Sequence, residues 1–330
     1  MTRIKNAIVL LLVLAGAAQG APPARVQETR PLMGTVVGIT AEGADGARLH
    51  AAVGAAYREM GRLTDMMNHY DPKSVVSAIN EAAGERPVAT PPELFEVLET
   101  AQKLAQRTSG AFDITVGALR GWRFRRDDPR LPPAEEIAVQ RALVDYRRLR
   151  LDRGAGNAFL AARGMRIDLG GIAKLYILRA GLRVLERHAV ARAMVNGGGD
   201  VLVSGGGWRI GVRDPLDPAK LIGLVEIDRG AVVTSGDYER YFVRDGKHYH
   251  HILDPRTGYP SEGPRGVTLI GEVDEVNGTA IAIMVLGRKA GVGLLAATPA
   301  VDAFIADRDG SVWMSEGFRK RLREVPAAAR

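Results

Sequence analysis

One stretch near the middle of the second half of the chain constrains the rest more than any other. It runs from Thr234 to Pro260 and reads TSGDYERYFVRDGKHYHHILDPRTGYP. Turn-forming glycines and prolines alternate there with strand-like segments, and the ionisable side chains gather between them: Asp237, Glu239, His248, His250, His251 and Asp254. An exposed hairpin would also be polar, but it would not need this many turn residues together with a run of histidines. The pattern is typical of a functional site on loops held by a rigid scaffold.

The composition excludes several classes of protein. The chain has 330 residues, of which 46% are hydrophobic, so it can bury a large core in one domain or two subdomains. Its net charge is +7, but no run of basic residues marks a nucleic-acid face and aromatic residues are only 5%. We therefore expect no nucleic acid among its partners.

The first 20 residues have the pattern of a secretory signal peptide. Arg3 and Lys5 precede a short apolar segment over residues 7–15, and Ala18 and Gly20 supply small residues for cleavage after Gly20. An uncleaved membrane anchor is the alternative. The chain has no cysteine, which excludes disulfides, thiolate metal sites and lipid attachment at a cysteine. A bacterial periplasmic location fits these features best.

The remaining sequence predicts an α+β fold with largely antiparallel sheets and flanking helices. Periodicity and capping residues predict helices over residues 46–67, 90–108, 132–143, 174–188 and 276–286. Short apolar segments predict strands, among them 36–40, 165–168, 208–212, 224–227, 231–234 and 267–270, and a terminal hairpin over 301–314. We expect a linker over residues 21–27, a folded domain over 28–315 and a basic C-terminal tail over 316–330.

Two further segments have the composition of binding sites. Asp168 to Lys174 reads as a strand, a glycine turn and the start of a helix, where free backbone amides attract anions. The alternative is tight strand–helix packing, and the spacing of a P-loop is absent. Tyr70 lies beside an Asp-Pro turn and could be core or an aromatic platform for a flat ligand.

Five blocks in order carry a resemblance to a known family. They are Met33-Gly34-Thr35; the block from Tyr70-Asp71-Pro72 to Asn80; Phe112-Asp113 with Thr115 and Gly117; Asp168 to Lys174 followed by Asn196 to Asp200; and the stretch from Thr234 to Gly258. In this order they resemble the ApbE family of FAD:protein FMN transferases. The resemblance covers nearly all of the chain from Arg30 to about Val312. It implies a fold of two intertwined α/β subdomains.

The resemblance also implies a chemistry and a set of site residues. Members of the family bind FAD and a divalent cation, normally Mg²⁺, and transfer FMN through its phosphate to a threonine or serine of a partner protein, releasing AMP. It implies these FAD contacts: Met33, Tyr70, Ala111, Phe112, Asp113, Asp168, Lys174, Glu239 and Ile252. His251 is the candidate base for the acceptor hydroxyl, because imidazole titrates near neutral pH. The alternative is that His250 and His251 alternate on a strand, one at the surface and one only hydrogen-bonded.

The chain departs from the family pattern at the metal site. Counting back from Val285-Leu286-Gly287, Asn277 and Ile281 stand where the family has an aspartate and a threonine, four residues apart on one helical face. The third expected ligand is a backbone oxygen near Gly171. Mg²⁺ prefers several oxygen ligands, so we expect its binding to be weakened or lost. Arg179, where the family has an acidic residue, could partly replace the cation at the phosphate.

The sequence thus predicts an exported FAD:protein FMN transferase that modifies a redox partner protein and meets the membrane only through that partner. A non-catalytic FAD-binding or delivery protein and an FAD pyrophosphatase are the alternatives. The resemblance suggests subunits of membrane redox complexes or a regulator of nitrous oxide reduction as acceptors, without identifying one.

Overall fold

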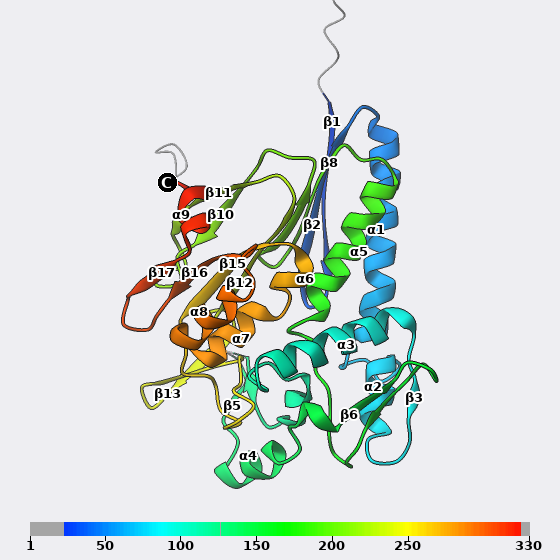
Figure 1. The fold of residues 1–330 in the computed structure, drawn as a ribbon. Coiled ribbons are helices and arrows are strands. Elements are labelled where there is room, and N and C mark those ends of the chain that lie inside the picture. Colours follow the sequence, from blue (N-terminus) through cyan, green and yellow to red (C-terminus); the bar gives the residue numbers. More distant parts are fainter. Residues whose placement is uncertain (1–22, 126, 325–330) are drawn as a thin grey trace, which may run out of the picture.

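The computed structural model describes residues 23–125 and 127–324, so the predicted signal peptide and its cleavage site lie outside the described residues. Its centre is an eight-stranded sheet in which every neighbouring pair is antiparallel (Figure 1). In spatial order the strands are β1 (Ala24–Leu32), β2 (Thr35–Gly43), β8 (Arg192–Gly197), β9 (Asp200–Ser204), β12 (Gly230–Gly236), β15 (Gly266–Gly271), β16 (Asp302–Ala306) and β17 (Val312–Met314).

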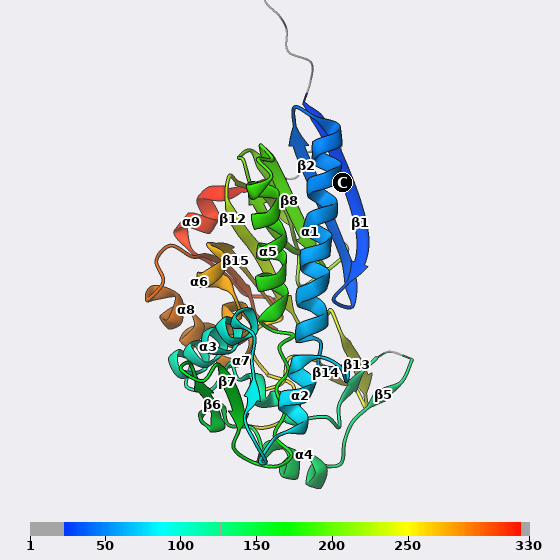
Figure 2. The same ribbon diagram turned by 90° about the vertical axis from the view of Figure 1, so that its right-hand side faces the viewer.

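Helices cover one face of this sheet, and further helices lie at one end of it. The helices are α1 (Gly46–Met67), α2 (Val75–Glu81), α3 (Pro92–Arg107), α4 (Ala134–Arg141), α5 (Ala173–Arg187), α6 (Val273–Val276), α7 (Thr279–Leu286), α8 (Arg288–Ala296) and α9 (Glu316–Arg321). Two 3₁₀ turns, Ile114–Ala118 and Tyr146–Arg148, lie in the connections. Figure 2 shows α1 and α5 side by side along the face of the sheet. This mixture of helices and antiparallel sheets confirms the predicted α+β class.

The sequence explains why α1 and α5 lie so close together. Asp45 caps α1 by accepting hydrogen bonds from the backbone amides of Ala47 and Arg48. The buried face of α1 follows helical spacing, as predicted, and includes Met60. A methyl group on Gly181 of α5 would lie 2.6 Å from the Met60 sulfur, so glycine allows this close approach without a shift of the Met60 side chain.

Two cores form because successive side chains of a strand point to opposite faces. Alternate residues of β9, β12 and β16, such as Leu202, Val233 and Ile305, join the helices in the main core. Their neighbours, such as Val203, Val232 and Phe304, face a second core under a small sheet. That sheet contains β10 (Trp208–Arg213), β11 (Leu221–Ile227) and β18 (Leu322–Arg323).

The remaining short strands lie below the end of the main sheet, near α2, α3 and α4. They are β3 (Val88–Ala89), β6 (Leu149–Asp152) and β7 (Asn157–Leu160) in one sheet, and the hairpins β4 (Arg123–Phe124) with β5 (Pro129–Arg130) and β13 (Tyr241–Arg244) with β14 (Lys247–His250). A third apolar cluster that includes Trp122, Ile137 and Phe242 fixes the β13–β14 hairpin against this lower part.

Both ends of the predicted domain need correction. The expected linker over 21–27 is instead partly strand, because β1 begins at Ala24, which pairs with Gly43 at the end of β2. The expected tail over 316–330 is folded as far as the structure describes it, because α9 buries Phe318 completely and β18 pairs with β11. An apolar residue within a basic segment was the signal for this packing.

Two internal predictions also need correction. The helix expected over 276–286 is interrupted, because Gly278 adopts a left-handed φ of 72° and α7 starts at Thr279. The segment 165–168 is not a strand, since the Asn80 side chain takes the place of a partner strand. Its Nδ2 donates to the Ile167 carbonyl at 3.1 Å, and its Oδ1 accepts from the Ile167 amide at 2.7 Å. Within the described residues, no helix is long and apolar enough to cross a membrane.

Candidate functional site

His251 lies directly after β14, at the base of the β13–β14 hairpin. Its backbone amide donates to the Arg240 carbonyl at 3.1 Å, and its Nδ1 lies 3.3 Å from the same oxygen. The carbonyl can only accept, so this contact favours the tautomer with the proton on Nδ1 and leaves the Nε2 lone pair available. Burial, reinforced by the positive charge of Arg240, lowers the pKa of His251 to about 3. His251 is therefore a neutral imidazole near pH 7 and can accept a proton, although a pKa this low makes it a weaker base than a free imidazole.

Lys174 joins the helix side of the site to the sheet side. It lies in the first turn of α5, and its Nζ is 2.5 Å from Oδ2 of the buried Asp200 at the start of β9. The other Asp200 oxygen accepts from the backbone amide of Thr234 in β12 at 3.2 Å. The Lys174 charge is close enough to contribute to the lowered pKa of His251. Lys174 therefore lies within electrostatic reach of His251, and a shared role of the two residues at one site stays a prediction.

Tyr70 lies near both Asp168 and Arg240. The Asp168 carboxylate accepts from the Gly170 amide at 2.7 Å and lies 3.3 Å from His69 Nδ1. The His69 ring is 3.9 Å from the Tyr70 ring, which is 78% exposed and so presents an open aromatic face. Although Tyr70 is mostly exposed, partial desolvation raises its pKa, Asp168 raises it further and Arg240 opposes both. Arg240 is therefore a shared neighbour of Tyr70 and His251.

A crowded glycine corner lies beside the Asp168–Lys174 turn. A methyl group on Gly171 would lie 2.8 Å from the Ile281 side chain and 3.2 Å from the Phe112 ring. A methyl group on Gly278 would lie 3.0 Å from the same Phe112 ring. The predicted metal segment and the predicted FAD segment therefore meet at Phe112, although they are far apart in the sequence.

The residues at this corner do not fit the Mg²⁺ site that the family implies. Asn277 is 8% exposed, and its Oδ1 has no hydrogen-bond partner within the described residues. Ile281 offers only hydrocarbon toward Gly171. No cluster of three or more His, Cys, Asp or Glu in residues 23–125 and 127–324 could hold a metal. One neutral amide oxygen and nearby backbone oxygens fall short of the charged oxygen set that Mg²⁺ prefers.

The corner also corrects the expectation that Asn277 and Ile281 share one helical face. Asn277 is the residue after α6 and has φ −63° and ψ 118°, whereas Ile281 lies in the first turn of α7. Gly278 makes the turn between the two helices. Tertiary folding, rather than helical periodicity, therefore places them near one another.

Asp113 has a structural role in the described chain. Its Oδ1 accepts from the amide and hydroxyl of Thr115 at 2.8 and 2.7 Å, and its Oδ2 accepts from the Tyr146 amide at 2.8 Å. Burial raises its pKa, and these hydrogen bonds oppose that effect. Both carboxylate oxygens are engaged by the protein. A contact of FAD with Asp113 itself stays a prediction.

The other predicted FAD contacts differ in their surroundings. Met33 has a left-handed φ of 53° in the turn between β1 and β2. In the same turn, the Oγ1 atom of Thr35 would lie 2.8 Å from a methyl group on Gly198. The Met33–Thr35 turn therefore lies beside the Asn196–Asp200 turn. Glu239 is exposed, whereas Ala111 and Ile252 are buried. Their contacts with FAD remain predictions.

Arg179 does not face this site in the structure. Its guanidinium pairs with Asp274 and lies 3.4 Å from Glu96, and it lines a cavity of about 140 Å³ that is formed by α1, α3 and α5. Two carboxylates therefore neutralise its charge. The hypothesis that Arg179 replaces a cation at the phosphate gains no support.

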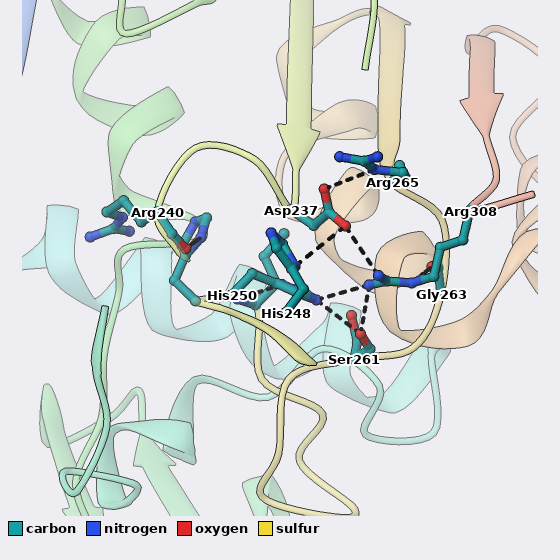
Figure 3. Close-up of polar contacts among 10 residues, drawn as sticks. Asp237, Arg240, His248, His250, Ser261, Gly263, Arg265 and Arg308 are labelled. Carbon is teal, nitrogen blue, oxygen red and sulfur yellow. Dashed lines mark hydrogen bonds and ion pairs between the residues drawn. The ribbon is translucent and has the colours of Figure 1, made fainter. Parts of the chain in front are cut away.

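Sequence reasoning missed a charged cluster behind the hairpin, which Figure 3 shows. Asp237 is 1% exposed, and Arg265 and Arg308 approach its two oxygens at 3.4 and 3.3 Å. Arg308 comes from the β16–β17 hairpin, 71 residues after Asp237. The turn Asp307–Gly310 was predicted, but only folding shows which way the Arg308 side chain points.

Comparison with known proteins identifies the family to which the chain is similar. The sequence model of the ApbE family matches residues 33–305. The FAD:protein FMN transferase of Klebsiella pneumoniae (strain 342) is 33% identical over 276 residues, covering 82% of this chain and 87% of that protein. The FAD:protein FMN transferase of Treponema pallidum (strain Nichols) is 30% identical over 352 residues, covering 97% and 95%.

Solved structures show the same fold. The ApbE protein from Thermotoga maritima superposes with a TM-score of 0.83 at 32% identity, covering 91% of this chain and all of that one. The flavin transferase ApbE from Vibrio cholerae superposes with a TM-score of 0.78 at 27% identity, with 91% and 100% coverage.

Proposed function

Since the chain belongs to the ApbE family, we propose that it is an exported FAD:protein FMN transferase that uses His251 as its base. The acceptor is a threonine or serine hydroxyl of a redox partner protein, and AMP is the second product. The relatives' activity supports the reaction class. The predicted signal peptide supports export to the periplasm, with membrane contact only through the partner.

The proposed role of His251 rests on one observation, the protonation and tautomeric state of its imidazole ring. A neutral imidazole whose Nδ1 is held by the Arg240 carbonyl has Nε2 free to accept a proton. In the proposed step, the acceptor oxygen attacks the phosphorus of the FMN half of FAD. The bond from that phosphorus to the oxygen of the AMP half breaks, and AMP leaves with the electron pair of this P–O bond. The hydroxyl proton goes to Nε2 of His251.

The remaining roles follow from position. The exposed Tyr70 ring offers a face for the flavin or adenine ring. Lys174 lies at the start of α5, where backbone amides of the glycine turn favour a pyrophosphate, and a bound phosphate would share the Lys174 ammonium with Asp200. Magnesium would neutralise the pyrophosphate in family members, but the corner of Gly171, Asn277 and Ile281 does not fit it well, so we assign it no step here.

The poor fit at that corner favours one second candidate, a non-catalytic FAD-binding or delivery protein. A fold that keeps its aromatic face and lysine but lacks the charged metal ligand would still bind FAD. An FAD pyrophosphatase, in which water replaces the protein hydroxyl, is distinguished from both the transferase and the carrier by the experiment below.

The test uses the purified chain lacking residues 1–20, FAD, an acceptor domain with its threonine, and Mg²⁺ or EDTA. Mass spectrometry of the acceptor and chromatography of nucleotides are the readouts. We expect acceptor carrying FMN and an equal amount of AMP. AMP and FMN without adduct would establish hydrolysis instead, and stoichiometric intact FAD would establish a carrier. An acceptor with threonine replaced by valine is the matched control.

A further inference from the structure

The charged cluster behind the β13–β14 hairpin contacts the segment that contains the histidines. Its central residue is Arg308, in the turn between β16 and β17. Arg308 Nε donates to the Gly263 carbonyl at 3.0 Å, Nη2 donates to the Ser261 carbonyl at 3.2 Å, and Nη1 lies 3.3 Å from Asp237 Oδ2. One side chain thereby ties together the end of β12 and the loop that follows the histidines (Figure 3).

His250 connects this cluster to His251. Its Nε2 lies 2.9 Å from the Ser261 carbonyl and 3.2 Å from Arg308 Nη2, and its Nδ1 accepts from the Ile252 amide at 3.3 Å. The hydrogen bond from Ile252 to His250 spans His251. The backbone on both sides of His251 is therefore fixed by the His250 ring.

The protonation state of His250 is consistent with this role. The ring is completely buried, and burial lowers its pKa to about 4. A neutral ring with its proton on Nε2 donates to Ser261 and accepts from Ile252 at the same time. A protonated ring would present a second donor to the Ile252 amide and break that hydrogen bond.

We propose that Arg308 is a positioning residue for the base: through Ser261, Asp237 and His250 it sets the orientation of His251 without touching the substrates. This inference rests on the proposed function for its catalytic consequence, but its structural part does not. Three anchors converge on one guanidinium, and a fork of five N–H donors is suited to holding several acceptors at fixed angles. A displacement of about 1 Å in a reacting group can reduce a rate by about 100-fold.

The experiment compares Arg308→Gln, Arg308→Lys and a control, Arg319→Gln, which makes the same charge change on exposed α9. We expect Arg308→Gln to lower kcat for FMN transfer by about 10- to 100-fold, while FAD affinity changes by less than about 2-fold, because Arg308 contacts no predicted FAD residue. Lysine keeps the charge beside Asp237 but cannot reach all three anchors, so Arg308→Lys should be intermediate. Arg319→Gln should match the parent chain.

A second readout does not depend on catalysis. Ring ¹⁵N spectra of the six histidines, assigned with a His251→Gln variant, report the tautomer of His251. We expect one tautomer, with the proton on Nδ1, in the parent chain and a mixture in Arg308→Gln. If the parent chain transfers no FMN, the proposed function fails, and the spectra still test the positioning.

Unchanged kcat and an unchanged His251 tautomer in Arg308→Gln would overturn the inference. A loss of kcat accompanied by an equal loss in Arg319→Gln would overturn it too. If Arg308→Gln does not fold by circular dichroism, Arg308→Lys decides by the same two readouts.

Discussion

The histidine hairpin and the glycine corner differ in how they accommodate buried polar groups. At the hairpin, the buried Asp237 carboxylate is met by two guanidinium groups. At the corner, the buried Asn277 oxygen has no hydrogen-bond partner within the described residues, and Ile281 lies nearby. Burying charge is costly unless it is paired, so the hairpin keeps its charges by pairing them, whereas the corner has no charge to pair. Under the proposed function, proton transfer and phosphate neutralisation rest on different residues, and we expect that they can be changed independently.

The largest expected effect is at the hairpin. We expect His251→Ala to reduce FMN transfer by about 10²- to 10⁴-fold, because the acceptor hydroxyl loses its general base. Mass spectrometry of the flavinylated acceptor measures the rate. His50→Ala, an exposed histidine on α1, is the control and should retain full activity. Transfer by His251→Ala above about a tenth of the parent rate would show that His251 is not the base, and the proposed difference in role between the hairpin and the corner would fail.

The second prediction concerns acid stability. His250 has a folded pKa of about 4, lowered by burial, against an unfolded value near 6.5. The unfolded chain therefore binds the proton first, and the neutral ring's contribution to stability is fully present above pH 6.5 and is lost as the pH falls to about 4. The loss should be roughly 3 kcal/mol in the free energy of unfolding. The lowered pKa of His251 likewise reduces the free energy of unfolding as the pH falls.

Urea unfolding at pH 7 and pH 4.5 measures this difference. The variant His250→Gln carries no titrating ring, so its difference between the two pH values should be smaller than that of the parent chain. An equal pH dependence in both chains would show that the buried hairpin histidine does not titrate as its surroundings indicate.

The third prediction restores charge at the corner. We expect Asn277→Asp with Ile281→Thr to raise Mg²⁺ affinity by about 10- to 100-fold, because a carboxylate and a hydroxyl replace an amide and hydrocarbon. In EDTA the same variant should unfold at lower urea than the parent chain, since its buried carboxylate has no cation. Titration calorimetry and urea unfolding are the measurements, with each single substitution as a control. Unchanged Mg²⁺ affinity would show that this corner is not the metal position.

The smallest effect is expected at Arg179. Its guanidinium is already paired with Asp274 and Glu96, so Arg179→Ala should change FAD affinity by less than about 2-fold and stability by about 1 kcal/mol or less. Lys174→Ala is the matched comparison and should weaken FAD binding clearly. Flavin fluorescence titration measures both. Equal weakening by the two variants would mean that Arg179 does supply charge at the phosphate.

The sequence by itself determined the elements that local physical chemistry controls. Asp45 and Ser74 cap helices because their side chains accept hydrogen bonds from nearby backbone amides, a local effect that acts within a few residues. The α+β class followed from the mixture of periodicities, and five ordered blocks indicated the family. The same blocks led to the prediction that Tyr70, Lys174 and His251 belong to one site.

The tertiary structure decided what depends on contacts between distant segments. Asn80 replaces a partner strand at Ile167, 87 residues away. Phe318 turns an expected tail into part of a core, and Gly278 separates Asn277 from the helix of Ile281. Arg308 reaches Asp237 and His250 only because β16 lies beside β15, which pairs with β12. Periodicity and capping act within a few residues, whereas side-chain direction across a sheet is set by the packing of the whole chain.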